Sequence, residues 1–336
     1  MIAPAFWDRR PPTPTARLLA PLGAIYGAAT AWRMGRRGQA APVPVICVGN
    51  FIAGGAGKTP AAIEIAKLLR RAGERPAFLS RGYGGARRAE TLAVDANIHD
   101  AAFVGDEPLL LARIAPCFVG VDRVASARAA CEAGASVLVL DDGLQNSALA
   151  KDFVFVVSDA QYGFGNGLCV PAGPLRAPLR AQARHVSAAI EIGAPGPVDW
   201  LGPHLPGRPH FRARLEADAV AASAFVGRPV YAFAGIARPE KFFATLKTIG
   251  ANVVKTAAFA DHQAFDPRRL SAILEESSRR SLTPVTTEKD WVRLPSEFKN
   301  RIDVLPVTLR FEEPRGVLGL MTAAIAAARS GRISRL

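Results

Sequence analysis

Short apolar runs alternate with amphipathic segments along the first half of the chain. The apolar runs are continuous, as in strands that are buried on both faces of a sheet, while the segments between them repeat at helical spacing. We expect strands at 42–50, 75–80, 117–121, 135–143, 152–159 and 186–193, and helices at 59–73, 107–116 and 122–134. This alternation predicts a parallel α/β sheet with right-handed crossovers and helices on its faces.

A second, smaller α/β unit is predicted from the later part of the chain. The stretch 163–184 is rich in Gly, Pro and Arg and is expected to form an ordered loop, and a Pro/Gly-rich boundary follows at 194–209. Beyond it strand and helix patterns alternate again, and an Ala-rich helix begins at about Pro314. We therefore divide the chain into 1–37, 38–205 and 206–336, with the terminal helix returning to the core.

An apolar helix is predicted within 1–37. Its uncharged part, Leu18 to Trp32, is about 15 residues long, or roughly 22 Å as a helix. A membrane span needs about 20 residues, so this segment is short for one. Its flanks carry Arg17, Arg33, Arg36 and Arg37. Apolar side chains bordered by cations favour a helix lying in an anionic membrane interface, and the alternative is a helix docked on the protein's own core.

The composition narrows the class of protein without naming a partner. The chain of 336 residues has 42 Lys and Arg against 29 Asp and Glu, a formal net charge of +13. Such a surplus suits nucleic acid, an acidic membrane surface or a phosphorylated small molecule. The four Cys are widely spaced and the five His show no metal-ligand spacing, which favours a reducing cytoplasm over a disulfide framework or a zinc site.

The segment GNFIAGGAGKTP, residues 49–60, has the form of a phosphate-binding loop between a strand and a helix. Gly57, Lys58 and Thr59 match the usual pattern, but Ile52 stands where the first glycine is expected. Backbone N–H groups and the helix N-terminus can still bind phosphate, Lys58 can bridge the terminal phosphates, and Thr59 can ligate Mg²⁺. The nucleotide-binding residues are predicted to be Ile52, Ala53, Gly54, Gly55, Ala56, Gly57, Lys58 and Thr59.

Two pairs of carboxylates are the candidate acids. Asp141 and Asp142 end an apolar strand, where a parallel sheet holds Mg²⁺ beside the phosphate loop. Asp106 and Glu107 stand just ahead of a helix. That second pair fits either a helix cap or a general base with a metal-supporting acid.

Two further polar clusters lie in the smaller unit. Asp261 and His262 occur in FADHQAF, and a lone His is more often structural than catalytic. TTEKDW, residues 286–291, has some likeness to a guanine-binding N-K-x-D loop but lacks its Asn. The missing Asn counts against a GTPase.

Seven motifs in one order resemble the tetraacyldisaccharide 4′-kinases of lipid A synthesis. They are GNFIAGGAGKTP, LSRGYGG, VGDEPLLLA, DDGLQN, PAGPLR, FADHQAF and TEKDW, and they span nearly the whole chain. The family also has an apolar N-terminal helix and an Ile- or Ala-type residue at the position of Ile52. The chain departs from the family at Asn146, where the family often has His.

The resemblance implies transfer of the γ-phosphate of ATP to the 4′-hydroxyl of a lipid A disaccharide 1-phosphate, giving lipid IVA. It implies that Asp106 is the base and that His262 is its partner in a dyad; Lys58 of the phosphate loop is also expected to be catalytic. The residues expected around Mg²⁺ and the phosphates are Thr59, Glu107, Asp141, Asp142 and Gln145. The candidates for acceptor or phosphate contact are Arg81, Arg123, Arg176 and Arg180.

The acceptor implied by the resemblance is an anionic, acylated lipid in the cytoplasmic leaflet of the bacterial inner membrane. We therefore expect a monomer that lies on this surface, as a peripheral or monotopic protein, and that has no nucleic-acid partner. The alternatives are a P-loop GTPase that acts as a switch or metallocentre chaperone, and a nucleic-acid-binding ATPase. The second rests on charge alone, because the chain has no aromatic and basic platform.

Overall fold

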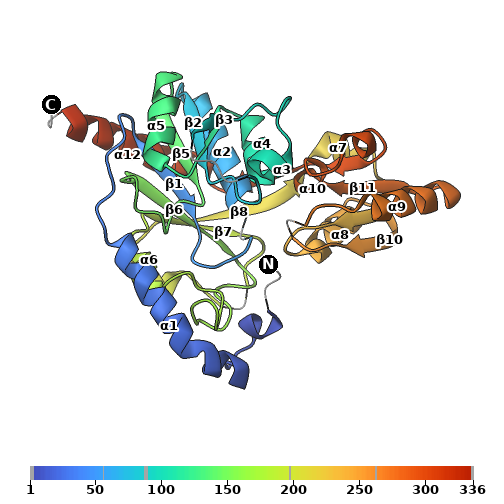
Figure 1. The fold of residues 1–336 in the computed structure, drawn as a ribbon, viewed down its shortest axis with the longest axis horizontal. Coiled ribbons are helices and arrows are strands. Elements are labelled where there is room, and N and C mark those ends of the chain that lie inside the picture. The colour runs from blue at the N-terminus through green and yellow to red at the C-terminus, as the bar shows by residue number, and fades with distance from the viewer. Residues whose placement is uncertain (1–3, 56, 87–89, 197, 262, 334–336) are drawn as a thin grey trace.

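The computed structural model describes residues 4–55, 57–86, 90–196, 198–261 and 263–333 (Figure 1). These residues form two lobes. The larger lobe is built on a nine-stranded sheet and the smaller lobe on a four-stranded sheet. In Figure 1 the smaller lobe lies to the right of the larger one, and helix α1 (Pro14–Met34) lies below the large sheet.

The nine-stranded sheet has the order β13-β8-β7-β6-β1-β5-β2-β4-β3. In that order, the strands are Val307–Phe311, His210–Ala217, Ala188–Ile192, Phe153–Asp159, Val45–Gly49, Val137–Asp141, Pro76–Ser80, Cys117–Val119 and Leu92–Ala93. Neighbours from β8 to β4 pair in parallel, whereas β13 and β3, at the two edges, pair antiparallel. The predicted parallel α/β core is confirmed, and its two antiparallel edge strands are an addition to it.

Alternate residues of the central strands face two apolar layers. In β1, Ile46 and Val48 pack with α2 (Lys58–Arg71) on one face, whereas Val45 and Cys47 pack on the opposite face with α5 (Arg123–Glu132). The continuous apolar pattern of these strands follows from this burial on both sides. Two short elements of the lobe are α3 (Ala101–Val104) and α4 (Asp106–Ala112), and α6 (Leu179–Ala183) lies in the Pro- and Arg-rich loop.

Strand β8 is absent from the sequence-based expectations. Its residues alternate, with Phe211 and Ala213 buried and their neighbours exposed, because one face of this strand lies against the core and the other against solvent. The terminal helix α12 (Pro314–Ile333) packs Val317, Met321 and Ile325 into the cluster that covers α2. The division at residues 37/38 and 205/206 stays a prediction, and β8, β13 and α12 from the last segment belong to the larger lobe.

The smaller lobe has the strand order β10-β9-β11-β12, and every pairing in it is parallel. Its strands are Asn252–Ala258, Pro229–Ala234, Thr283–Thr287 and Asp303–Leu305 in that order. Its helices are α7 (Ala219–Ser223), α8 (Pro239–Thr248), α9 (Pro267–Arg279), α10 (Glu288–Trp291) and α11 (Ser296–Lys299). Arg238 and Lys241 reach across to Asp159 at the end of β6, so ion pairs as well as the chain join the lobes.

Helix α1 docks through small residues and leaves large apolar ones outside. A Cβ on Gly23 would lie 2.6 Å from the Cys169 carbonyl oxygen, and one on Gly27 would lie 2.7 Å from Cys169 Sγ. The large apolar side chains of α1 that are exposed are Leu18, Leu22, Ile25, Tyr26 and Trp32, with Leu18 81% and Ile25 69% exposed.

Over the described part of the chain, no helix has both the length and the hydropathy required to cross a membrane.

Candidate active site

The predicted phosphate loop lies between β1 and α2 at the carboxyl edge of the large sheet. Gly57 has φ of +82°, and a Cβ there would lie 2.5 Å from Ile192 Cδ1, so glycine is required for both conformation and space. Ile52 pairs with Leu175 as an isolated antiparallel bridge, and the Ala53 N–H donates to the Pro174 carbonyl oxygen at 2.7 Å. The residue in place of the first glycine is thus extended and anchored on a neighbouring loop. Ala56 lies outside the described residues.

Lys58 is the first residue of α2, and its side chain turns back over its own loop. Its Nζ donates to the Gly54 carbonyl oxygen at 3.1 Å and lies 3.8 Å from Asp142 Oδ1. Phosphate oxygens of a bound nucleotide could take the place of both of these oxygen atoms as partners of the Lys58 ammonium group. The start of α2 has no side-chain cap, so its positive helix end adds to the same place.

Asp141 ends β5 as a buried carboxylate with one unsatisfied oxygen. Its Oδ2 accepts a hydrogen bond from Thr59 Oγ1 at 2.9 Å, whereas its Oδ1 is buried without a hydrogen-bond partner among the described residues. Burial, together with the charges of Glu107 and Asp142, raises the pKa of Asp141 to about 7. A buried carboxylate oxygen that accepts no hydrogen bond, with a hydroxyl group next to it, is well suited to bind a cation.

The next residue, Asp142, has cations on its carboxylate. Arg176 Nη1 and Nη2 donate to its two oxygens at 2.7 and 2.9 Å, a bidentate pair. Burial by itself would raise the pKa of Asp142, but Lys58 and Arg176 hold it at about 2. Asp142 is therefore an anion with protein partners, while its neighbour Asp141 has an open acceptor.

Asp106 and Glu107 begin α4 on the side of the larger lobe that faces the smaller one. Gly105 before them has φ of +92°, and a Cβ there would lie 2.6 Å from the Tyr83 carbonyl oxygen, so this glycine lets the GYGG loop touch the start of α4. Asp106 is 3% exposed, and its Oδ1 accepts the Glu107 N–H at 2.9 Å. Burial raises the pKa of Glu107, against the opposing charges of Lys289 and Lys58.

The predicted acceptor arginines differ in their surroundings. Arg81 and Arg180 are exposed. Arg123 is buried and donates to the Ser80 carbonyl oxygen, and burial together with the charge of Arg81 lowers its pKa to about 10. Arg176 lies on Asp142, as described above. Of these four, Arg81 and Arg180 have side chains open to a large ligand.

Gln145 lies in a chain of amides beneath the phosphate loop. Its Nε2 donates to the Asn50 carbonyl oxygen at 2.7 Å and to Gln182 Oε1 at 2.8 Å, while its Oε1 accepts from Arg176 at 3.2 Å. Both ends of this amide thus have protein partners, and it holds Arg176. Gln182, fully buried on α6, donates in turn to the Phe51 carbonyl oxygen at 3.1 Å.

His262 lies outside the described residues. Its neighbour Asp261 contacts Lys289, whose Nζ lies 3.3 Å from Asp261 Oδ1 and 3.9 Å from Asp106 Oδ2. Lys289 belongs to TEKDW, which the sequence marks as polar without giving it a role. Arg293, Asn50 and Gln182 are missed altogether, because single polar residues beside apolar ones give no spacing signal.

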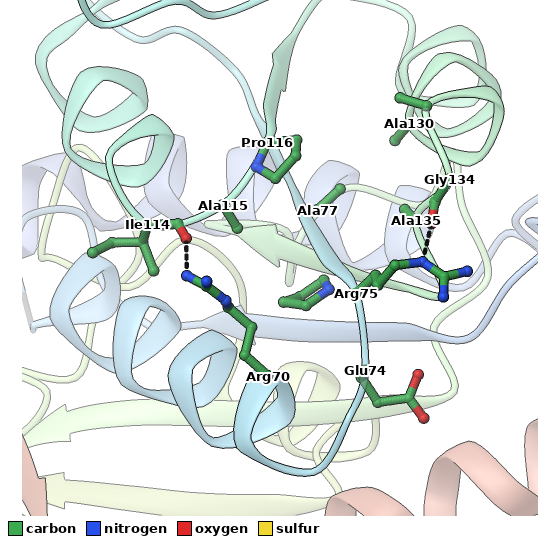
Figure 2. Close-up of a pocket in the computed structure, with 12 residues that line it drawn as sticks. Arg70, Glu74, Arg75, Ala77, Ile114, Ala115, Pro116, Ala130, Gly134 and Ala135 are labelled. Carbon is green, nitrogen blue, oxygen red and sulfur yellow. Dashed lines mark hydrogen bonds between the residues drawn. The ribbon is translucent and has the colours of Figure 1, made fainter.

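A hollow of about 320 Å³ lies at the opposite edge of the large sheet (Figure 2). Arg70, Glu74, Ala77, Pro116 and Gly134 are among its lining residues, and they come from the amino-terminal ends of the strands and the helix ends beside them. None of the predicted site residues lines it. The candidate chemistry therefore lies at the carboxyl edge, where a parallel sheet usually binds its ligands.

Comparison with known proteins identifies the family. Residues 15–326 match the model of the LpxK family, tetraacyldisaccharide-1-P 4′-kinase. The chain belongs to the tetraacyldisaccharide-1-phosphate 4′-kinase family. The family resemblance expected from the seven motifs is confirmed.

Relatives of this kinase family match over the whole chain. A tetraacyldisaccharide 4′-kinase of Methylobacterium sp. (strain 4-46) is 54% identical over 334 residues, 99% of each chain. One from Bradyrhizobium diazoefficiens is 45% identical over 339 residues, 100% of each. A crystal structure of LpxK from Aquifex aeolicus in complex with ATP matches with a TM-score of 0.73 at 25% identity, covering 92% of this chain and 99% of that one.

Proposed function

We propose that this protein transfers the γ-phosphate of ATP to the 4′-hydroxyl of tetraacyldisaccharide 1-phosphate, giving lipid IVA. The observation that carries the proposal is the family match over residues 15–326, which includes every motif of the candidate site. The phosphate loop, the buried Asp141 and the acid pair of α4 supply the groups that such a transfer needs.

ATP binds in this proposal along residues 52–59. The positive end of α2 and the loop N–H groups take up phosphate oxygens. Lys58 exchanges the Gly54 carbonyl and Asp142 for the terminal phosphates, which requires only a rotation of a long side chain. Arg176 keeps Asp142 ionised and in place during this exchange.

Mg²⁺ fits the residues around Asp141. Thr59 Oγ1, Asp141 Oδ1 and Glu107 would hold it, and the bound ion would neutralise charge on the phosphates. Among the described residues no three His, Cys, Asp or Glu side chains gather closely enough to bind a metal by themselves. Mg²⁺ keeps waters and phosphate oxygens as most of its ligands, so one or two carboxylates beside the phosphates would be enough to hold it.

Asp106 is the proposed general base, with His262 as its dyad partner. Asp106 is buried at the start of α4, next to Glu107 and facing the smaller lobe. It would accept the proton of the acceptor hydroxyl as the phosphoryl group transfers, which contributes about 10²–10⁴-fold in rate. Positioning and charge neutralisation supply the larger share.

The acceptor is a lipid, so the protein is proposed to act as a monomer on the cytoplasmic face of the inner membrane. The outer side of α1 carries Leu18, Leu22 and Ile25 exposed to solvent, beside arginines at both of its ends. Each arginine contributes about 1 kcal/mol toward anionic lipid near the surface. Arg81 and Arg180, which are exposed, are the proposed contacts for the acceptor's phosphate.

The test is incubation with γ-labelled ATP, Mg²⁺ and tetraacyldisaccharide 1-phosphate in mixed micelles, followed by separation of lipid from aqueous phosphate. Label that moves into lipid, with ATP preferred over GTP, supports the proposal. Label that appears only as inorganic phosphate contradicts it and favours a nucleotide hydrolase.

A further inference from the structure

The two lobes meet directly at Asp106. The chain around α10 of the smaller lobe packs on α4 of the larger one, and Val292 shares an apolar cluster with Val104 and Leu109. This packing places the cationic side chains at 289 and 293 beside the start of α4. The contact between the two lobes thus combines an apolar cluster with charged side chains around Asp106.

Lys289 contacts a carboxylate in each lobe. Its Nζ lies 3.3 Å from Asp261 Oδ1 of the smaller lobe and 3.9 Å from Asp106 Oδ2 of the larger one. Burial would lower the pKa of Lys289, but the charges of Asp106, Glu107 and Asp261 outweigh it and raise the pKa. The ammonium therefore stays charged between the two carboxylates.

Arg293 contacts residues of the smaller lobe and also approaches Asp106. Its Nη1 donates to the Gln263 carbonyl oxygen at 3.1 Å and its Nη2 donates to that of Gly235 at 2.7 Å, with a further bond to Asp290. Its Nε is buried without a hydrogen-bond partner among the described residues and lies 3.8 Å from Asp106 Oδ2. The side chain is 6% exposed, so this donor has no access to bulk water.

We propose that Lys289 and Arg293 are positioning residues that hold Asp261 and Gln263 of the smaller lobe against Asp106 of the larger lobe. This inference rests on the proposed function, in which His262 acts with Asp106. His262 stands in the chain between Asp261, which Lys289 contacts, and Gln263, whose carbonyl Arg293 binds. Two cations that face Asp106 therefore also hold the residues on either side of His262 in the chain, and so tie Asp261 and Gln263 of the smaller lobe to Asp106 of the larger one.

The test compares Lys289→Met with wild type in steady-state transfer to the lipid acceptor. A misplacement of about 1 Å costs about 10²-fold, so kcat should fall by about that factor while KM for ATP stays within about threefold. Lys289→Arg keeps the charge and the reach, and it should recover most of the rate. Thermal unfolding checks that each variant folds, and Lys289→Gln gives the same comparison if the Met variant does not fold.

Lys241→Met is the matched control, since Lys241 also joins the lobes through an ion pair, with Asp159, but does not contact Asp106. It should leave kcat near the wild-type value. Equal losses for Lys241→Met and Lys289→Met would reduce Lys289 to a link between lobes and overturn the inference. So would an unchanged kcat, or a raised KM for ATP or lipid at unchanged kcat, in Lys289→Met. Absence of lipid phosphorylation by the wild type would instead refute the proposed function.

Discussion

Replacing Asp141 by Asn should stabilise the metal-free protein and, in the same molecule, remove its activity. In the folded state burial and the charges of Glu107 and Asp142 raise the pKa of Asp141 to about 7, whereas an unfolded Asp titrates near 3.9. A carboxyl whose folded pKa is raised contributes its full stability below the unfolded pKa. That contribution is lost as the pH rises from about 4 through about 7.

The magnitude follows from the size of this pKa shift. At 1.36 kcal/mol per pKa unit, ionised Asp141 costs the folded state about 4 kcal/mol at pH 8. Asn removes the charge and can keep the hydrogen bond from Thr59, but its amide takes the position of the unpartnered Oδ1, at a cost of about 1–3 kcal/mol. The expected net gain is about 1–3 kcal/mol, or a rise of a few degrees in Tm.

The assay is thermal unfolding in buffer with a chelator at pH 8 and at pH 5. The Asn variant should have a higher Tm than wild type at pH 8, and the difference should shrink at pH 5, where wild-type Asp141 is protonated. Added Mg²⁺ and ATP should stabilise the wild type more than the variant. A lower Tm for the variant at pH 8, or a difference in Tm that does not depend on pH, would show that ionised Asp141 does not destabilise the fold.

Asp142→Asn is the matched control, because the adjacent carboxyl is shifted the other way. Lys58 and Arg176 hold the pKa of Asp142 at about 2, so its ionised form stabilises the fold above the unfolded pKa and that contribution is lost as the pH falls. The substitution should therefore lower Tm at pH 8 and matter less at acid pH. Opposite changes in Tm for substitutions at two neighbouring residues would distinguish an effect of charge from a general effect of substitution.

Three further outcomes are expected. Lys58→Ala should lower kcat by at least about 10²-fold, because it removes the cation beside the terminal phosphates, and single-turnover transfer checks it. Asp106→Ala should lose about 10²–10⁴-fold in kcat, and a near-normal rate would remove it from the dyad. The double change Leu18→Glu and Ile25→Glu should reduce co-flotation with anionic vesicles. Val254→Glu, a control at an exposed apolar side chain of the smaller lobe, should not reduce it. Equal flotation of the wild type, the double variant and the control would contradict membrane docking through α1.

The parallel core follows from the sequence because its strands are buried on both faces and its helices repeat at helical spacing. The start of α12 at Pro314 and the end of α2 near Gly73 also match the expected signals. Strand β8 is not predicted from the sequence, because its alternation of exposed arginines with Phe211 and Ala213 is short and follows a loop. Nothing local marks its pairing with β13, which comes almost a hundred residues later.

The candidate site divides in the same way. The phosphate loop and the Asp141–Asp142 pair are local motifs with known roles in phosphate and metal binding, so residue spacing predicts them. Arg176 illustrates the limit: its motif suggests acceptor contact, but the fold places its guanidinium on Asp142. The role of Lys289 depends on two lobes meeting at one carboxylate, and no sequence spacing encodes that contact.

Phosphoryl transfer to the 4′-hydroxyl is tested most directly with two acceptors that differ in that one group. Tetraacyldisaccharide 1-phosphate and its analogue without the 4′-hydroxyl are incubated separately with γ-labelled ATP, Mg²⁺ and the wild-type protein. Label is expected in a lipid bisphosphate with the first acceptor, and no label is expected in lipid with the second. Equal labelling of both lipids, or labelling of neither, would contradict it.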